Sequence, residues 1–161
     1  MRRSKPDVAD PGACERTALD LLARREHSRR ELERKLASRG FPGETIASAL
    51  DVLEESGQLA AARFTESFIR SRVAKGQGPA RIRAELAERG IDREQAAELL
   101  RAADIDWVAL ASSVRDKRFG APRPTDFKER ARQARFLEYR GFDHEQIGSV
   151  LSSGRREDPR S

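Results

Sequence analysis

The sequence predicts an all-α protein of three tandem three-helix repeats that form an elongated, curved molecule. A basic helical segment that ends in Arg-Gly-apolar occurs three times, and its glycines are Gly40, Gly90 and Gly141. These glycines are 50 and 51 residues apart, and a fixed period of this size is typical of repeat proteins. Alternation of apolar and polar residues at period two is absent and β-branched residues are sparse, so no strand is expected.

The three segments agree on both sides of the glycine. Leucine stands four residues before each glycine, glutamate four residues after it, and leucine ten residues after it. Glycine readily adopts the left-handed conformation that closes a helix. We therefore expect Gly40, Gly90 and Gly141 to be structural helix caps, each joining the second and third helices of its repeat by a tight turn.

The first repeat is expected at residues 13–57. It follows residues 1–12, which hold two prolines and a glycine among charged residues and are expected to form a disordered tail. Apolar residues at helical spacing predict a first helix from Ala13. Ser28 and Glu31 form the Ser-x-x-Glu capping box that starts a second helix, and a third helix follows the glycine turn.

The second repeat is expected at residues 58–103. Its first helix starts near Ala60 and ends at the break formed by residues 76–78, Gly-Gln-Gly. Pro79 then stands in the first turn of a new helix, where its missing N–H costs nothing. Asp92 is an N-cap candidate for a short, alanine-rich third helix.

The third repeat is expected at residues 104–152. Apolar residues at i, i+3, i+4 and i+7, counted from Trp107, predict an amphipathic first helix, and a basic last turn that includes Arg115 closes it. A proline-broken loop leads to the second helix, the most basic stretch of the chain, and Asp143 is the N-cap candidate of the third. Residues 153–161 are expected to form a disordered tail.

The charge of the chain favours an acidic partner. The 161 residues carry a net charge of +5 and give a pI of about 10.0. Nucleic acid, an anionic membrane surface or an acidic protein would each suit this balance. No run approaches the ~18 apolar residues of a membrane span, and the N-terminus lacks the apolar core of a signal peptide. We therefore expect a cytoplasmic protein with no membrane partner. We also expect it to be a monomer.

Catalysis, cofactors and bound metals are not expected. Cys14 is the one cysteine of the chain, so no intrachain disulfide or thiol cluster can form. His27 beside Ser28 could suggest a base and a nucleophile, but Ser28 is better explained as an N-cap and no third orienting group can be placed. The glycines at 76 and 78 are not a phosphate loop, because no strand precedes them and no Gly-Lys-Ser/Thr follows.

The basic residues are the remaining candidates for a binding site. The second helix of every repeat is basic, and so are the ends of the first helices. Stacked repeats would align these side chains into one stripe that binds phosphates without sequence preference. The candidates are Arg29, Arg34, Lys35, Arg81, Arg83, Lys117, Arg118, Lys128, Arg130, Arg132 and Arg135. The third helices lack rows of Arg, Asn or Gln that would read base edges, so backbone contact is favoured over base-specific recognition.

Several segments resemble the RecX family of bacterial regulatory proteins. They include REHSRREL at residues 25–32, RFTESFIRSR at 63–72, KRFG at 117–120 and RFLEYRGF at 135–142. The resemblance covers roughly residues 14–152. It implies three repeats of a three-helix unit and no catalytic motif.

The resemblance also implies a partner and an action. RecX-like proteins modulate RecA, the recombinase that polymerises on single-stranded DNA, and typically inhibit it by lodging in the filament groove and blocking extension. The expected partners are therefore the RecA filament and, weakly and through the backbone, single- and double-stranded DNA. Two alternatives remain: an autonomous, non-sequence-specific DNA-binding protein, and a helical scaffold for another acidic protein.

Overall fold

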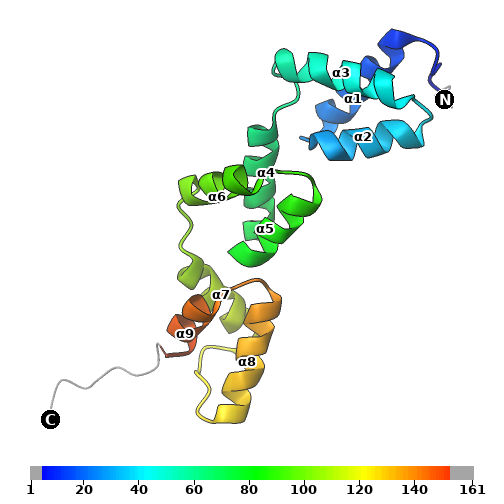
Figure 1. Ribbon diagram of the computed structural model, residues 1–161. Helices are drawn as coiled ribbons and strands as arrows, with labels where there is room; N and C mark the ends of the chain where they lie inside the picture. The colour runs from blue at the N-terminus through cyan, green and yellow to red at the C-terminus, as the bar shows by residue number, and fades with distance from the viewer. Residues whose placement is uncertain (1–4, 153–161) are drawn as a thin grey trace, which may run out of the picture.

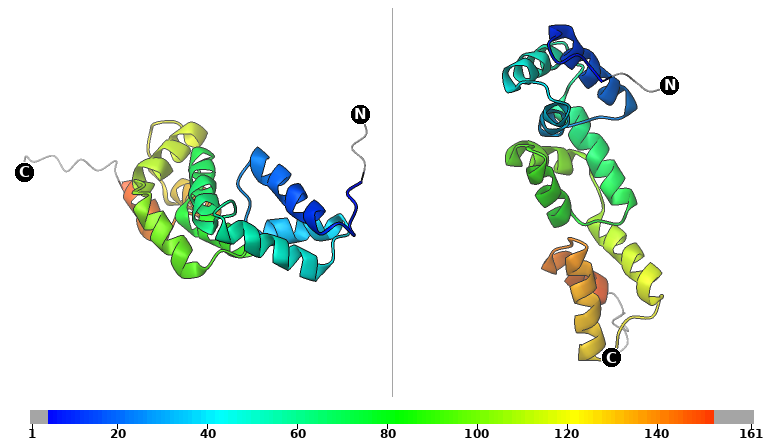
Figure 2. Two further views of the ribbon diagram at one scale, coloured as in Figure 1. Left: turned by 90° about the horizontal axis from the view of Figure 1, so that it is seen from above. Right: turned by 90° about the vertical axis from the view of Figure 1, so that its right-hand side faces the viewer.

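The computed structural model describes residues 5–152, and within this range it contains nine α-helices and no strand, so the all-α prediction is confirmed. The helices form three units of three, which follow one another along an elongated, curved molecule (Figure 1, Figure 2). The expected tail at 153–161 and residues 1–4 of the expected N-terminal tail lie outside the described residues. No described helix has the length and apolar character needed to cross a bilayer.

Unit 1 consists of α1 (Pro11–Arg24), α2 (Arg29–Ser38) and α3 (Gly43–Glu55). Helix α1 begins two residues before the expected start because the Asp10 carboxylate accepts a hydrogen bond from the Gly12 N–H at 2.9 Å. Helix α2 begins after Ser28, whose hydroxyl oxygen accepts from the Glu31 N–H at 3.2 Å. Each side chain satisfies one of the backbone donors that a helix start leaves without an intrahelical partner.

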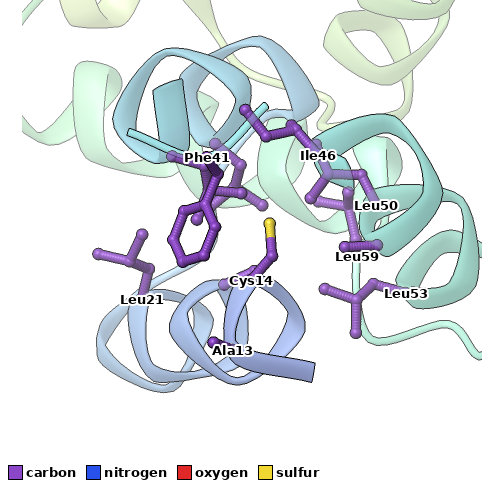
Figure 3. Packing of buried hydrophobic residues seen from close by; sticks show 12 residues of the cluster. Ala13, Cys14, Leu21, Phe41, Ile46, Leu50, Leu53 and Leu59 are labelled. Atoms are coloured by element: carbon purple, nitrogen blue, oxygen red, sulfur yellow. The ribbon is translucent and has the colours of Figure 1, made fainter. Parts of the chain in front are cut away.

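The core of unit 1 lies between its three helices. Phe41, just past the end of α2, and Cys14 on α1 point toward one another and toward the apolar face of α3 (Figure 3). Leu50 and Leu53 on α3 have no exposed surface. Burying a leucine side chain contributes about 1.5–3 kcal/mol, so these few apolar positions fix how the helices pack.

The other two units repeat this arrangement. Unit 2 consists of α4 (Ala61–Ala74), α5 (Pro79–Glu88) and α6 (Arg93–Ala102), and unit 3 of α7 (Trp107–Phe119), α8 (Phe127–Tyr139) and α9 (His144–Ser152). Each unit has its own cluster of buried apolar residues. Trp107 is half-buried and packs against the clusters of both units, so it helps to join them.

The turn between the second and third helices is the same in all three units. Gly40, Gly90 and Gly141 have φ values of +92°, +79° and +99°. In unit 1, the N–H of Phe41 donates to the Leu36 carbonyl and the N–H of Gly40 to the Ala37 carbonyl. Equivalent pairs of bonds close α5 and α8. This is the Schellman pattern, and it satisfies carbonyls that the end of a helix leaves free.

Units 2 and 3 meet through their backbones. The N–H of Gly78, just before α5, donates to the Arg140 carbonyl at 2.8 Å, and the N–H of Ala80 donates to the Gly141 carbonyl at 3.0 Å. The start of α5 therefore takes up carbonyls at the end of α8. A Cβ on Gly78 would come within 2.4 Å of the Gly141 backbone, so only glycine permits this approach.

Units 1 and 2 meet through polar side chains. Glu26 pairs with Arg63 at 3.0 Å, and Glu31 pairs with Arg89 at 3.2 Å. The Arg30 guanidinium also donates to the Glu88 carbonyl at 3.3 Å. The start of α2 thus lies at the end of α5, as the start of α5 lies at the end of α8, and the second helices follow one another along the molecule (Figure 1).

One residue of the expected basic turn of α7 is internal. Arg115 has no exposed surface. Its Nε donates to Gln133 Oε1 at 2.8 Å, and its Nη1 donates to the Gly120 carbonyl at 2.9 Å and to Asp116 Oδ1 at 2.6 Å. A further bond runs to the Pro122 carbonyl. Arg115 therefore holds the α7–α8 loop against α8 and does not present its charge to solvent.

Candidate binding surface

Among the candidate basic residues, Arg29 is neutralised within unit 1. Its guanidinium lies 3.1 Å from Glu33, 2.8 Å from Asp51 and 3.2 Å from Glu54. Partial burial lowers the pKa of Arg29, but the hydrogen bonds that Arg29 donates to these three carboxylates outweigh it and raise the pKa above its usual value. The side chain fastens α2 to α3, and little of its positive charge is left for a partner.

Lys35 is half-buried and bonded to a histidine. His27 is 2% exposed, and its Nδ1 lies 3.0 Å from the Arg25 carbonyl. A carbonyl can only accept, so Nδ1 carries the proton and Nε2 is left to accept from Lys35 Nζ at 3.0 Å. Burial lowers the pKa of His27 below 6.5 and, separately, lowers the pKa of the Lys35 ammonium.

Because His27 is buried in its neutral form, we expect the free energy of unfolding to fall as the pH is lowered. Because the folded state lowers the pKa of His27, the unfolded chain binds the proton more readily. The contribution of His27 to stability is therefore complete above the unfolded pKa of 6.5 and is lost as pH falls toward the folded value. Denaturant unfolding at about pH 7.5 and about pH 5.5 should show a larger loss for the natural protein than for His27→Gln. Equal losses in the two proteins would contradict the conclusion that folding lowers the pKa of His27.

Three further candidates lie on α2 and α5. Arg34 and Arg83 are exposed and have no ion pair within residues 5–152. Arg81 is half-buried, pairs with Glu85 at 3.5 Å, and places its guanidinium carbon 5.6 Å from the centre of the Tyr139 ring. Arg81 thereby connects unit 2 to the outer face of α8.

The outer face of α8 carries three of the candidates in one row. Lys128, Arg132, Arg135 and Tyr139 are spaced i, i+4, i+7 and i+11, and at about 3.6 residues per turn they fall within an arc of roughly 60°. All four are exposed, Tyr139 at 78%. We call this row the α8 stripe. Arg130 falls on the opposite side, where its Nη2 lies 3.4 Å from Ser152 Oγ on α9.

The α8 stripe continues onto the end of α7. The guanidinium carbons of Arg132 and Arg118 lie 5.3 and 5.9 Å from the centre of the Phe119 ring. Lys117 and Arg118 also line a cavity between units 2 and 3. Arg132 pairs with Glu129 at 3.1 Å, but such an exposed pair is worth only about 0–1 kcal/mol, so the Arg132 charge remains available to a partner.

The arrangement suits a polyanion. Exposed cations bind phosphates or carboxylates by charge, and an exposed aromatic ring can stack on a base or pack against a protein surface. The sequence interpretation missed Tyr139, although its spacing from Arg135 and Lys128 puts it on the same helix face. It also missed the exposed Phe127 at the start of α8, because this one helix was described by its charges alone.

Models of one protein family match all three units. Those described as the first, second and third three-helix domains of RecX match residues 14–53, 62–100 and 104–151. Together they include most of every helix of the described chain, in the expected order.

Individual proteins show the same likeness. The chain is 54% identical to the regulatory protein RecX of Pseudomonas entomophila over 142 residues, which are 88% of this chain and 92% of that one. It is 48% identical to the regulatory protein RecX of Halorhodospira halophila over 89% of both chains. The crystal structure of RecX from Lactobacillus salivarius superposes with a TM-score of 0.77 at 20% identity, covering 91% of this chain and 97% of that one, which shows a shared fold.

Proposed function

Because the chain belongs to the RecX family of regulatory proteins, we propose that it binds RecA filaments in the cytoplasm and inhibits RecA activity. Lodged in the helical groove of the filament, it would block extension. The ATPase, strand-exchange and co-protease activities of RecA would then fall together, since all of them need the filament. The protein acts by binding, and DNA repair and recombination are the processes it would regulate.

The observation that carries this proposal is the family match over all three units. The shape supports it: three small units in an elongated, curved row (Figure 2) can follow a helical groove over a longer distance than a compact domain of equal mass. The α8 stripe supports it as well, because a nucleoprotein filament offers phosphates and acidic side chains along its groove.

The first test is the single-stranded-DNA-dependent ATPase of RecA with this protein added at substoichiometric amounts. We expect a progressive fall in the rate of hydrolysis, because each molecule that blocks a filament end prevents many later additions of RecA. An unchanged rate, with the protein folded, would contradict the proposal.

We further propose that the α8 stripe makes the filament contact. Charge reversal at Lys128, Arg132 and Arg135 together should weaken binding to RecA filaments by about tenfold or more at physiological salt, because the new negative charges would be repelled by the acidic surface. Sedimentation with RecA on single-stranded DNA measures the loss. All three side chains are exposed, so the melting temperature should change little.

Arg130→Glu is the matched control for the stripe. Arg130 lies on the same helix and carries the same charge, but it faces Ser152 and not the outer arc. If Arg130→Glu weakens binding as much as the single reversal Arg135→Glu on the stripe does, general charge and not the α8 stripe governs the contact.

A second candidate function is autonomous, non-sequence-specific DNA binding. Tyr139, exposed and flanked by Arg135 on its own helix and by Arg81 from unit 2, favours it, because aromatic rings within a basic row suit single strands. Pulldown with RecA in the absence of DNA separates the two functions. Capture of RecA supports the regulatory role, whereas a gel shift of DNA without capture of RecA supports the second.

A further inference from the structure

A cavity of about 250 Å³ lies between units 2 and 3. The end of α4, one side of α7 and the end of α8 form its walls. Gly76, Ser113 and Phe136 line it together with cationic side chains. Because both units contribute to the walls, the cavity exists only when unit 3 is docked on unit 2.

The charged side chains that line this cavity are all positive. Lys75, Lys117, Arg118 and Arg140 line it, and no Asp or Glu does. Within the described part of the chain, none of these four side chains forms an ion pair. Three helix C-termini nearby would each supply about −0.5 of a charge. These dipoles offset less than half of the four positive charges, so the cavity has an excess of positive charge.

Two of the cations are held in place before any ligand arrives. The Arg140 guanidinium donates to the Lys75 carbonyl at 3.0 Å, and its carbon lies 5.3 Å from the centre of the Phe136 ring. The Arg118 guanidinium carbon lies 5.9 Å from the same ring centre. Side chains that are already ordered lose less entropy on binding, which favours a ligand that accepts hydrogen bonds from both.

From these observations we propose that the cavity between units 2 and 3 binds a phosphate group. A phosphate presents several charged oxygens at once, and guanidinium and ammonium groups are its usual partners in proteins. A single carboxylate would leave most of the positive charge unpaired. The volume is below the ~300 Å³ at which pockets for whole small molecules begin, so the site suits a phosphate with part of an attached sugar better than a complete nucleotide.

Two ligands could supply this phosphate group: the backbone of a single strand of nucleic acid, or free inorganic phosphate. The neighbouring α8 stripe favours the strand, because Arg118 of the cavity and Arg132 of the stripe lie against the same Phe119 ring. A strand along the stripe could thus place one phosphate in the cavity. The site is independent of the proposed action on RecA, since it concerns the isolated protein.

The test is an NMR titration of the full-length ¹⁵N-labelled protein with a short oligothymidylate, inorganic phosphate or oligoglutamate. We expect saturable shifts of the Gly76 and Ser113 amides, which line the cavity. In the double variant Lys75→Gln/Lys117→Gln, the affinity for the ligand that shifts these amides should fall about tenfold. If that ligand is the strand, the slope of log K against log salt concentration should become less steep by about 0.7 for each phosphate contact removed. Both lysines are exposed, so folding should be unaffected.

The control is Arg93→Gln/Arg101→Gln on α6, which also removes two exposed charges but does not alter the lining of the cavity. Shifts with the oligonucleotide alone identify a strand site, and shifts with inorganic phosphate identify a free-phosphate site; both support the proposal. It is overturned if neither ligand moves Gly76 and Ser113, if oligoglutamate of equal charge moves them as strongly, or if the control loses as much affinity.

Discussion

The Arg115→Ala variant is expected to lose about 3–5 kcal/mol of stability, because it removes one partner from a buried, charged hydrogen-bond network. Arg115 has no exposed surface and donates to Gln133, to Asp116 and to two carbonyls of the α7–α8 loop. Alanine would leave Gln133 Oε1 and the loop carbonyls without this donor and would open a cavity beside Gln133, which is itself 3% exposed. Denaturant unfolding followed by circular dichroism measures the loss.

The loss should be concentrated in unit 3. Hydrogen exchange should show faster opening of α7 and α8 than in the natural protein, with α1–α3 almost unchanged, since unit 1 has a separate core. Arg118→Ala is the matched control. It removes the same side chain from the same helix at an exposed position, and it should cost less than about 0.5 kcal/mol. Similar losses in the two variants would show that Arg115 is not essential to the packing.

Asp116 bridges this network to a second arginine. Partial burial raises the pKa of Asp116, but hydrogen bonds from Arg123 and Arg115 and their positive charges outweigh it, so the pKa lies below the usual value. The carboxylate therefore stays ionised at neutral pH and links Arg115 on α7 to Arg123 in the loop between α7 and α8.

The Gly141→Ala variant is expected to lose roughly 2–5 kcal/mol. Gly141 has a φ of +99°, which costs a residue with a Cβ about 1–2 kcal/mol. The added Cβ would also lie 2.4 Å from the Arg81 Cβ and 2.7 Å from the Arg81 backbone nitrogen. Backbone cannot rotate away as a side chain can, so units 2 and 3 must separate, at an overpacking cost of about 1–3 kcal/mol.

The equivalent glycines form a graded series of controls. A Cβ on Gly40 would meet only Val8 at 3.6 Å, an ordinary contact, so Gly40→Ala should show the backbone cost alone. A Cβ on Gly90 would come within 3.1 Å of the flexible Arg30 guanidinium, so Gly90→Ala should be intermediate. Melting temperatures of the three variants measure the order. Equal losses would mean that the approach of the two backbones does not contribute.

Much of this fold is encoded locally. The repeat of about 50 residues, the glycine turns and the N-cap at Ser28 depend on residues within one or two helical turns of one another. The spacing of apolar residues then assigns one face of each helix to a core. Short-range patterns of this kind can be read in the sequence, and they were sufficient to predict the all-α class and the three units.

Whether an individual charged side chain is paired, buried or exposed depends on the tertiary structure. Arg29 and Arg132 occur in similarly basic helices, yet Arg29 meets Asp51 and Glu54 on α3, whereas Arg132 lies on an open face with Phe119 beside it. Arg115 is one of several cations in the last turns of α7, and it is buried because Gln133 and the loop after α7 supply acceptors.

The sequence by itself thus determined the class of fold, the number of units and their shared turn, because these follow from backbone preferences and apolar spacing over a few residues. Only the tertiary structure decided which charges face solvent, which glycines let two backbones touch, and that four cations surround one cavity. These properties depend on contacts between residues that are far apart in the sequence, such as Lys75 and Arg140, which are 65 positions apart. A contact over that separation depends on how whole units pack.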